Sequence, residues 1–274
     1  RGLWKDIPDF ALGRFAWDQR RILKAIRPFD VDIIYNPKLS VPLSARCKTI
    51  FTMHGLEQFA ARHLFVWHDR LYFTIAMKFY CARADAILVM TETGRRDLKR
   101  FLGVPDEKIH VIPESYNENC RIIREQGELD RVRAKYHLPG RYILFLGGVT
   151  PLKNIPALLM AYSMVRSRGV GHKLVLAGFK RWKFAADLET ADQLGLREDV
   201  VDPGFIEDDD IPAVYNMADC FVLPSFYEGF GIPILEAQAC GCPVVISTGG
   251  AMQEVAGPGG ALTFHPDRPE DLAD

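Results

Sequence analysis

Short runs of β-branched and other apolar residues alternate with longer segments of helical period along the whole chain, and this alternation constrains the fold more than any other feature. In a parallel sheet each strand is followed by a helix that carries the chain back to the same edge. The pattern therefore predicts an α/β protein. The expected strands are residues 31–35, 49–53, 86–90, 109–112, 142–146, 173–177, 200–204, 220–223, 244–246 and 261–264.

The strands divide into two groups, which predicts two domains. The second group contains six strands with helices between them, the content of a complete doubly wound unit, whereas the first group has about four. A polar stretch, 113–126, interrupts the alternation. We expect a partial first domain over residues 1–116, a connection over 117–140 and a second domain over 141–274. Doubly wound sheets bind ligands at the carboxyl ends of their strands, so the loops there are the candidate sites.

Charge is balanced in total but not along the chain. There are 34 Lys and Arg against 35 Asp and Glu, which argues against a dedicated nucleic-acid-binding protein. Residues 198–274 contain 15 acidic residues and one basic residue, whereas residues 1–91 contain 14 basic and 8 acidic residues. The uneven distribution leaves two interpretations open: two ordinary solvated surfaces, or a basic first domain that meets anionic material.

The segment PSFYEGFGIPILE, residues 224–236, carries the strongest chemical signal. It follows an apolar strand and opens a helix, where glycines let backbone amides approach an anion such as phosphate. Glu228 and Glu236 are good acceptors for sugar hydroxyls and poor ligands for phosphate. The alternative is a capped helix with two solvated glutamates.

A second strand–loop–helix junction, FLGGVTPLKN, ends at residue 154. A glycine pair, Gly147 and Gly148, precedes Thr150 and Lys153 at the start of a helix, a combination that would hold phosphate. An ordinary turn with a surface lysine is equally compatible with this segment. The P-loop spacing and the dinucleotide-binding glycine pattern are both absent.

A third candidate is His54, in the segment TMHG at the end of a first-domain strand. This position suits a side chain that faces a ligand-binding cleft. A histidine with a purely structural role is the alternative, and no histidine spacing here indicates a metal site.

Taken together, these segments resemble the retaining GT-B glycosyltransferases of family 4. The resemblance rests on Glu228 and Glu236 in PSFYEGFGIPILEAQACGCPVV, on GGVTPLKN, on TMHG and on GFIEDDDIPAVYNMADCFVLPS. It implies a GT-B fold, in which two Rossmann-like doubly wound domains face each other across a cleft. Many members have Arg at the position of Gly148. The chain is expected to be truncated at both ends, with an incomplete N-terminal domain.

The resemblance also implies roles for individual residues. Glu228 would contact the donor hexose, Glu236 the ribose, and Lys153 the diphosphate, while His54 would reach the sugar or the acceptor. Glu228, His54 and Lys153 are the implied catalytic residues, with no metal ion and no cofactor required. The other implied substrate-binding residues are Gly147, Gly148, Thr150, Ile206 beside Phe205, Gly229, Phe230 and Gly231.

The implied activity is transfer of a hexose, with retention, from a nucleotide diphosphate sugar to a glycan or lipid-linked acceptor. GDP-mannose is the favoured donor by similarity to bacterial polysaccharide mannosyltransferases. Two alternatives remain: a nucleotide-sugar-binding fragment without catalysis, and a sugar-nucleotide epimerase of the same architecture. With no signal-peptide pattern and no run as long as a membrane span, the expected location is cytoplasmic, with possible peripheral contact at the inner face of the membrane.

Overall fold

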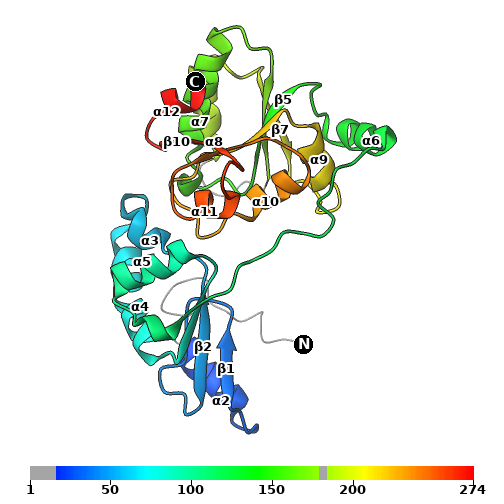
Figure 1. The fold of residues 1–274 in the computed structure, drawn as a ribbon. Helices are drawn as coiled ribbons and strands as arrows, with labels where there is room; N and C mark the ends of the chain where they lie inside the picture. Colours follow the sequence, from blue (N-terminus) through cyan, green and yellow to red (C-terminus); the bar gives the residue numbers. More distant parts are fainter. Residues whose placement is uncertain (1–16, 179–183) are drawn as a thin grey trace. The chain divides into compact units, whose positions relative to one another are not determined.

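The computed structural model describes residues 17–178 and 184–274, which belong to two compact units, Arg1–Pro113 and Glu114–Asp274 (Figure 1). Each unit contains one sheet flanked by helices, and all the strand pairs in the described residues are parallel. The predicted α/β class is therefore confirmed. No helix within the described residues is long and apolar enough to cross a membrane.

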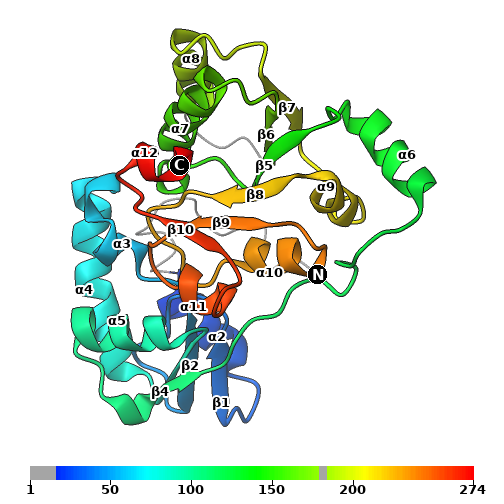
Figure 2. The same cartoon turned by 45° about the horizontal axis from the view of Figure 1, so that its top comes forward.

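The first unit has a four-stranded sheet in the order β1-β2-β3-β4. Helices α3, α4 and α5 lie together beside this sheet (Figures 1 and 2). Its described elements are η1 (Trp17–Arg21), α2 (Ile22–Ile26), β1 (Ile33–Asn36), β2 (Lys48–Met53), α3 (Glu57–Ala60), η2 (Arg62–Leu64), α4 (Trp67–Arg83), β3 (Ala86–Val89), α5 (Glu92–Leu102), η3 (Asp106–Lys108) and β4 (Ile109–Val111).

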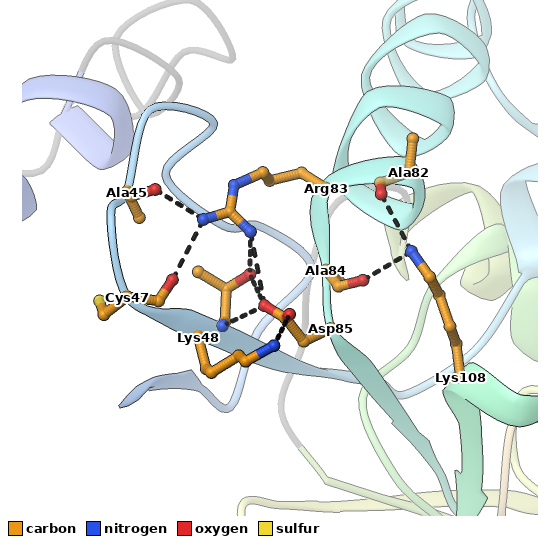
Figure 3. A network of polar contacts seen from close by, with 9 residues as sticks. Ala45, Cys47, Lys48, Ala82, Arg83, Ala84, Asp85 and Lys108 are labelled. Atoms are coloured by element: carbon orange, nitrogen blue, oxygen red, sulfur yellow. Dashed lines mark hydrogen bonds and ion pairs between the residues drawn. The ribbon is translucent and has the colours of Figure 1, made fainter. Parts of the chain in front are cut away.

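A polar network at the amino ends of β2 and β3 fixes the carboxyl end of α4 (Figure 3). Lys48 Nζ donates to the Asp85 carboxylate at 2.9 Å, and this hydrogen bond lowers the pKa of Asp85 to about 2. Arg83 donates to two carbonyl oxygens of the loop before β2, at 2.6 and 3.1 Å. Lys108 Nζ donates to two carbonyl oxygens at the end of α4, at 3.0 and 2.8 Å. The two bonds from Lys108 satisfy carbonyl oxygens that the end of a helix leaves without an intrahelical partner.

The second unit has a six-stranded sheet in the order β10-β9-β8-β5-β6-β7. One large core cluster of buried apolar side chains packs on this sheet. The described elements are α6 (Gln126–Tyr136), β5 (Tyr142–Leu146), η4 (Pro151–Lys153), α7 (Ile155–Ser167), β6 (Lys173–Ala177), α8 (Phe184–Gln193), β7 (Val200–Gly204), α9 (Ile211–Met217), β8 (Cys220–Leu223), α10 (Ile232–Ala239), β9 (Val244–Ser247), α11 (Met252–Ala256), β10 (Leu262–Phe264) and α12 (Pro269–Ala273).

The strand order reverses beside β5. From β5 the chain proceeds outward to β6 and β7, and then returns to place β8 on the other side of β5. The loops that follow β5 and β8 therefore leave neighbouring strands at this reversal. Such a switch point is where open parallel sheets bind ligands, at the carboxyl ends of the strands.

The segment 117–140, expected as a connection, lies within the second unit, which begins at Glu114. Cys120 and Ile123 belong to the core cluster, and α6 buries Val132 and Tyr136. The sequence is polar here because only a few positions of α6 face the core. The boundary between the two units falls between Pro113 and Glu114, ahead of the predicted connection.

Candidate functional site

Two segments singled out in the sequence meet at the switch point of the second unit. One follows β5 and ends at Asn154, and the other follows β8 and ends at Gly231. The amide of Phe226 donates to the carbonyl oxygen of Leu152 at 2.9 Å, which joins the two loops directly. The adjacency of β5 and β8 explains this meeting, since their carboxyl ends lie side by side.

Lys153 and Glu228 form an ion pair across these loops. Lys153 Nζ lies 2.6 Å from Glu228 Oε1, and both side chains are mostly shielded from solvent. Lys153 ends the short helix η4, which Asn154 terminates in a left-handed conformation with φ of 53°. The side-chain Nδ2 of Asn154 donates to the carbonyl oxygen of Pro266 at 2.8 Å and anchors this turn. Each charge thus compensates the other.

The loop after β9 supports the backbone of Glu228. The amide of Ala251 donates to the carbonyl oxygen of Glu228 at 2.9 Å, and Glu228 forms an isolated parallel bridge with Gly250. Gly250 has φ of 67°, and a Cβ atom there would overlap the Glu228 carbonyl. A Cβ atom at Gly249 would overlap the Phe226 carbonyl. Sequence reasoning did not single out this glycine pair, although its place directly after a strand is a usable signal.

The helix α10 begins at the end of the Glu228 loop. Gly231 occupies its N-cap position with φ of 102°, a left-handed conformation that other residues rarely adopt. No side chain caps the helix, and Pro233 sits in the first turn. Gly229 and Phe230 precede this start, with the Phe230 ring buried. A helix start of this kind favours an anion, because its first amides have no intrahelical acceptor and the helix dipole is positive there.

Glu236 lies about one turn into α10 and is partly buried. The Tyr215 hydroxyl donates to Glu236 Oε2 at 3.2 Å, and burial raises the pKa of the Glu236 carboxyl. Tyr215 itself is fully buried and packs edge-on against Phe221, with ring centroids 5.4 Å apart. A buried tyrosine therefore orients one glutamate of the pair, a contact that the sequence pattern did not reveal.

The glycines after β5 are positioned by the neighbouring strand β6. The amide of Gly147 donates to the carbonyl oxygen of Ala177 at 3.0 Å. Gly178 has φ of 127°, and a Cβ atom there would overlap the backbone of Gly147. Gly148 and Thr150 follow and are half-buried, and Thr150 makes no side-chain cap to η4. Gly178 is a further requirement of this loop that sequence reasoning missed.

The loop after β7 differs from expectation in one residue. Ile206 is buried in the core cluster, so its side chain does not line an open site. The neighbouring Phe205 is exposed instead. Adjacent side chains of an extended segment point to opposite sides, which explains why Phe205 is exposed whereas Ile206 is buried. Phe205 is thus the accessible aromatic surface of this loop.

His54 lies in the first unit, directly after β2, and its ring is exposed. Its Nε2 atom lies 2.7 Å from the carbonyl oxygen of Pro37. This places the histidine at the carboxyl end of a strand of the four-stranded sheet, as the sequence indicated. Among the described residues of both units, no group of three or more His, Cys, Asp and Glu side chains is arranged to hold a metal ion.

Comparison with known families covers nearly the whole chain. Residues 130–274 match the family described as "Glycosyl transferases group 1", and residues 4–118 match "Glycosyltransferase Family 4". The chain is 31% identical over 246 residues to the O-antigen chain mannosyltransferase B of Escherichia coli, covering 89% of this chain and 64% of that relative. It is 29% identical to the mannosylfructose-phosphate synthase of Agrobacterium fabrum, covering 69% of this chain and 43% of that protein. The chain thus spans less than two thirds of each of these relatives.

Solved structures share the fold at lower identity. HepE of Anabaena, in complex with UDP and glucose, superposes with a TM-score of 0.78 at 19% identity, covering 97% of this chain and 72% of that chain. The sucrose-phosphate synthase of Thermosynechococcus elongatus superposes with a TM-score of 0.76 at 20% identity, covering 92% of this chain and 65% of that chain. Both similarities concern the two-domain architecture.

Proposed function

The chain belongs to the group 1 glycosyltransferases of family 4, with a GT-B fold, and on this premise we propose that it transfers a hexose from a nucleotide diphosphate sugar to a glycan or lipid-linked acceptor. GDP-mannose is the proposed donor, supported by the mannosyltransferases among its relatives. Retention at the anomeric carbon and a cytoplasmic location are parts of the same proposal.

One observation carries the proposal: Lys153 and Glu228 pair at the switch point beside the start of α10. A diphosphate placed there would bring its own negative charge to Lys153. Glu228 would then be released to accept hydrogen bonds from hydroxyls of the donor hexose. The ion pair thus keeps the two proposed binding groups next to each other.

The chemical step follows from charge development. Departure of the nucleoside diphosphate leaves negative charge on its phosphates, and fixed cations and amides stabilise this charge in the transition state. Lys153 and the amides of Gly229, Phe230 and Gly231 are the proposed groups. Because they supply positive charge where other enzymes use a divalent ion, we propose that the reaction needs no metal. Transfer that is abolished by EDTA and restored by a divalent cation would contradict this part.

Glu236 is proposed to accept hydrogen bonds from the ribose, and Phe205 to flank the base. His54 is proposed to act on the sugar or the acceptor. In these roles Glu236 and Phe205 bind the leaving group, whereas Glu228 and Lys153 act next to the reacting bond. Substitutions in the two groups should therefore separate into effects on donor affinity and effects on turnover.

The test is transfer from labelled nucleotide sugars by the full chain, preceded by a calorimetric screen of GDP- and UDP-sugars. Lys153→Ala should lower kcat/KM by about a hundredfold, because it removes a charge that acts in the transition state. Glu228→Gln should lower it by a similar factor. Undiminished transfer by both variants would refute the site. An epimerised donor, or binding without transfer, would instead favour the epimerase or the non-catalytic alternative.

A further inference from the structure

Two buried thiols from distant parts of the second unit lie in contact. Cys120 is in the segment before α6, and Cys240 follows the last residue of α10. Both cysteines are free, and their exposed fractions are 7% and 3%. The thiol of Cys120 donates a hydrogen bond to the sulfur of Cys240. The fold therefore builds a dithiol from two cysteines that are far apart in the sequence.

The backbone around the dithiol is held in place. Helices α9 and α10 pack against each other (Figure 1). In α9, the side-chain Nδ2 of Asn216 donates to the carbonyl oxygen of Arg121, and its Oδ1 accepts from the amide of Ile123, both at 2.8 Å. After α10, a Cβ atom at Gly241 would lie 3.5 Å from Ile122 Cγ1. The two sulfurs are thus preorganised, which lowers the entropic cost of joining them.

The surroundings of the two sulfurs differ. Burial raises the pKa of Cys120 to about 12 and the pKa of Cys240 to about 11. The backbone amide of Arg121 donates to the sulfur of Cys240, which offsets part of the effect of burial. Because the thiolate is the reactive form of cysteine, Cys240 is the expected nucleophile. Both thiols are protonated at neutral pH, so the dithiol reacts slowly and only under a sustained supply of oxidant.

The dithiol lies one helical turn from Glu236. Cys240 follows Glu236 by four residues, so the two share one side of α10. The amide of Cys240 donates to the carbonyl oxygen of Glu236 at 3.1 Å. The Tyr215 hydroxyl, which donates to Glu236, also interacts electrostatically with both thiols. Glu236, Tyr215 and the two cysteines therefore form one cluster, in which a displaced sulfur affects the glutamate.

We propose that Cys120 and Cys240 are a redox switch, in which hydrogen peroxide converts the dithiol to a disulfide and thereby weakens donor binding at Glu236. A disulfide holds its two sulfurs about 2.05 Å apart, much closer than two hydrogen-bonded thiols. Closing this gap draws the end of α10 toward the segment of Cys120 and shifts Glu236 with it. The effect on the donor rests on the proposed function, whereas formation of the disulfide does not.

The oxidation is balanced by reduction of the peroxide. The Cys240 thiolate attacks one peroxide oxygen, the O–O bond breaks, and the hydroxide that leaves takes up the Cys240 proton to give water. The sulfur of Cys120 then displaces the hydroxyl group of the Cys240 sulfenic acid, which leaves with the Cys120 proton as a second water. One S–S bond forms and two S–H bonds break. The two electrons that the sulfurs lose reduce the peroxide to water.

The first test is treatment of the folded full chain with hydrogen peroxide, followed by thiol counting after unfolding. The reduced chain has six cysteines, and the oxidised chain should have two thiols fewer, with Cys120 and Cys240 linked in peptide mapping. Dithiothreitol should restore both thiols, which distinguishes a disulfide from a sulfinic acid. Cys240→Ser should not form the link. The matched control is Cys47→Ser, at a half-buried cysteine of the first unit, which should form the link as the wild type does.

The second test is calorimetry with GDP-mannose before and after oxidation. The linked protein should bind this donor about tenfold more weakly than the reduced protein, the loss expected when a hydrogen bond to a carboxylate is disturbed. Dithiothreitol should restore the affinity, and peroxide should leave the affinity of Cys240→Ser unchanged. A link between other cysteines, no link in the folded protein, or equal donor affinity of the linked and reduced forms would overturn the switch.

Failure of the proposed function would look different. Reduced protein that binds neither GDP-mannose nor a UDP-sugar would refute the proposed function together with the effect on the donor. The mapped link between Cys120 and Cys240 would still support the disulfide in that case.

Discussion

At the scale of single residues, the two glutamates of the site have different surroundings. Glu228 is neutralised by a lysine 75 residues away in the sequence, whereas Glu236 is partly buried and accepts a hydrogen bond from a neutral tyrosine hydroxyl. Burial without a counter-charge disfavours the ionised form, so the pKa of Glu236 is raised. The protein therefore holds a carboxylate at Glu236 at a cost to the folded state, as is common in binding sites.

At neutral pH, Glu236→Gln should leave the free energy of unfolding unchanged or raise it by up to about 1 kcal/mol, because it removes a partly buried charge. Because the pKa of Glu236 is higher in the folded state than in the unfolded state, ionising Glu236 costs the folded state free energy. This cost grows as the pH rises above the pKa of the unfolded state, and it disappears below about pH 4. Urea unfolding at pH 4 and pH 8 measures the difference. Destabilisation of the variant at pH 8 would contradict the assignment.

Tyr215→Phe removes the hydroxyl that orients Glu236 and keeps the ring against Phe221. A hydrogen bond to a carboxylate is worth enough to weaken donor binding by about tenfold when it is lost. The effect should appear in the dissociation constant and KM of the donor, with kcat little changed. A change confined to kcat would show that Tyr215 acts elsewhere.

Gly250→Ala tests whether the loop after β9 sets the position of Glu228. The new Cβ would overlap the Glu228 carbonyl, so the variant should lose about 3 kcal/mol of stability and most donor affinity. Gly103→Ala is the matched control, because Gly103 has a similar φ of 64° and nothing within 4 Å of its Cβ position. Its expected cost is about 1 kcal/mol, with donor affinity unchanged. Equal effects of the two variants in unfolding and calorimetry would refute the clash.

At the scale of elements, α6 shows how a polar segment becomes part of a domain. The helix contacts the core through few residues, including Val132 and Tyr136, and its polar face meets a single buried carboxylate, Asp210. Asp210 accepts hydrogen bonds from Lys135 and Arg131, both at 2.7 Å, and from the Tyr136 hydroxyl at 2.9 Å.

An acidic run, 208–210, directly precedes α9, where acidic side chains are favoured as caps. Asp210 does occupy the N-cap position of α9, but its side chain makes no cap hydrogen bond. Burial alone would raise the pKa of Asp210, yet the bonds from Lys135, Arg131 and Tyr136 outweigh burial and lower it. Its carboxylate is thus a tether for α6, whereas Asp208 and Asp209 are exposed.

Asp210→Asn should destabilise the protein by about 2–4 kcal/mol, because it removes the charge of a buried acceptor that Lys135, Arg131 and Tyr136 share. Asp209→Asn, one residue away and exposed, is the control and should change stability by less than about 0.5 kcal/mol. Because the pKa of Asp210 is lower in the folded state, its carboxylate stabilises the protein at pH values above the pKa of the unfolded state. This stabilisation is lost as the pH falls through the pKa of the folded state. The gap between wild type and variant, measured by urea unfolding, should therefore shrink below about pH 4.

At the scale of the whole molecule, the chain consists of two units with their own sheets and their own buried residues. The residues proposed to hold the donor nucleotide and its diphosphate all belong to the second unit. Its core cluster is drawn entirely from that unit, from Cys120 to Ala256. A unit with a complete core is expected to fold on its own.

Residues 114–274 produced alone should therefore bind the preferred nucleoside diphosphate within about threefold of the full chain. They should not transfer the hexose, because His54, which is proposed to act on the sugar or the acceptor, is absent. Calorimetry and the labelled-sugar assay measure the two properties. Loss of nucleotide binding in a folded fragment would show that the first unit contributes to the donor site.

The sequence by itself determined the elements that neighbouring residues encode. The bounds expected for β5, β6, β7 and β8 match the structure, because the strand period is a local property of the chain. The segments after β5 and β8 were also recognisable, since glycines and a helix start form a local pattern. Short helices such as α11 and α12 were missed, because five residues carry too little periodicity.

Only the tertiary structure decided which of these local features meet. The pairing of Lys153 with Glu228 and the tether of α6 to Asp210 join residues more than 70 positions apart in the chain. No local period encodes such a contact, because it depends on strand order. In α4, apolar residues occur on both faces, so the pattern could not tell the buried face from the exposed one. Periodicity predicts where apolar faces lie, and packing alone decides which of them the fold covers.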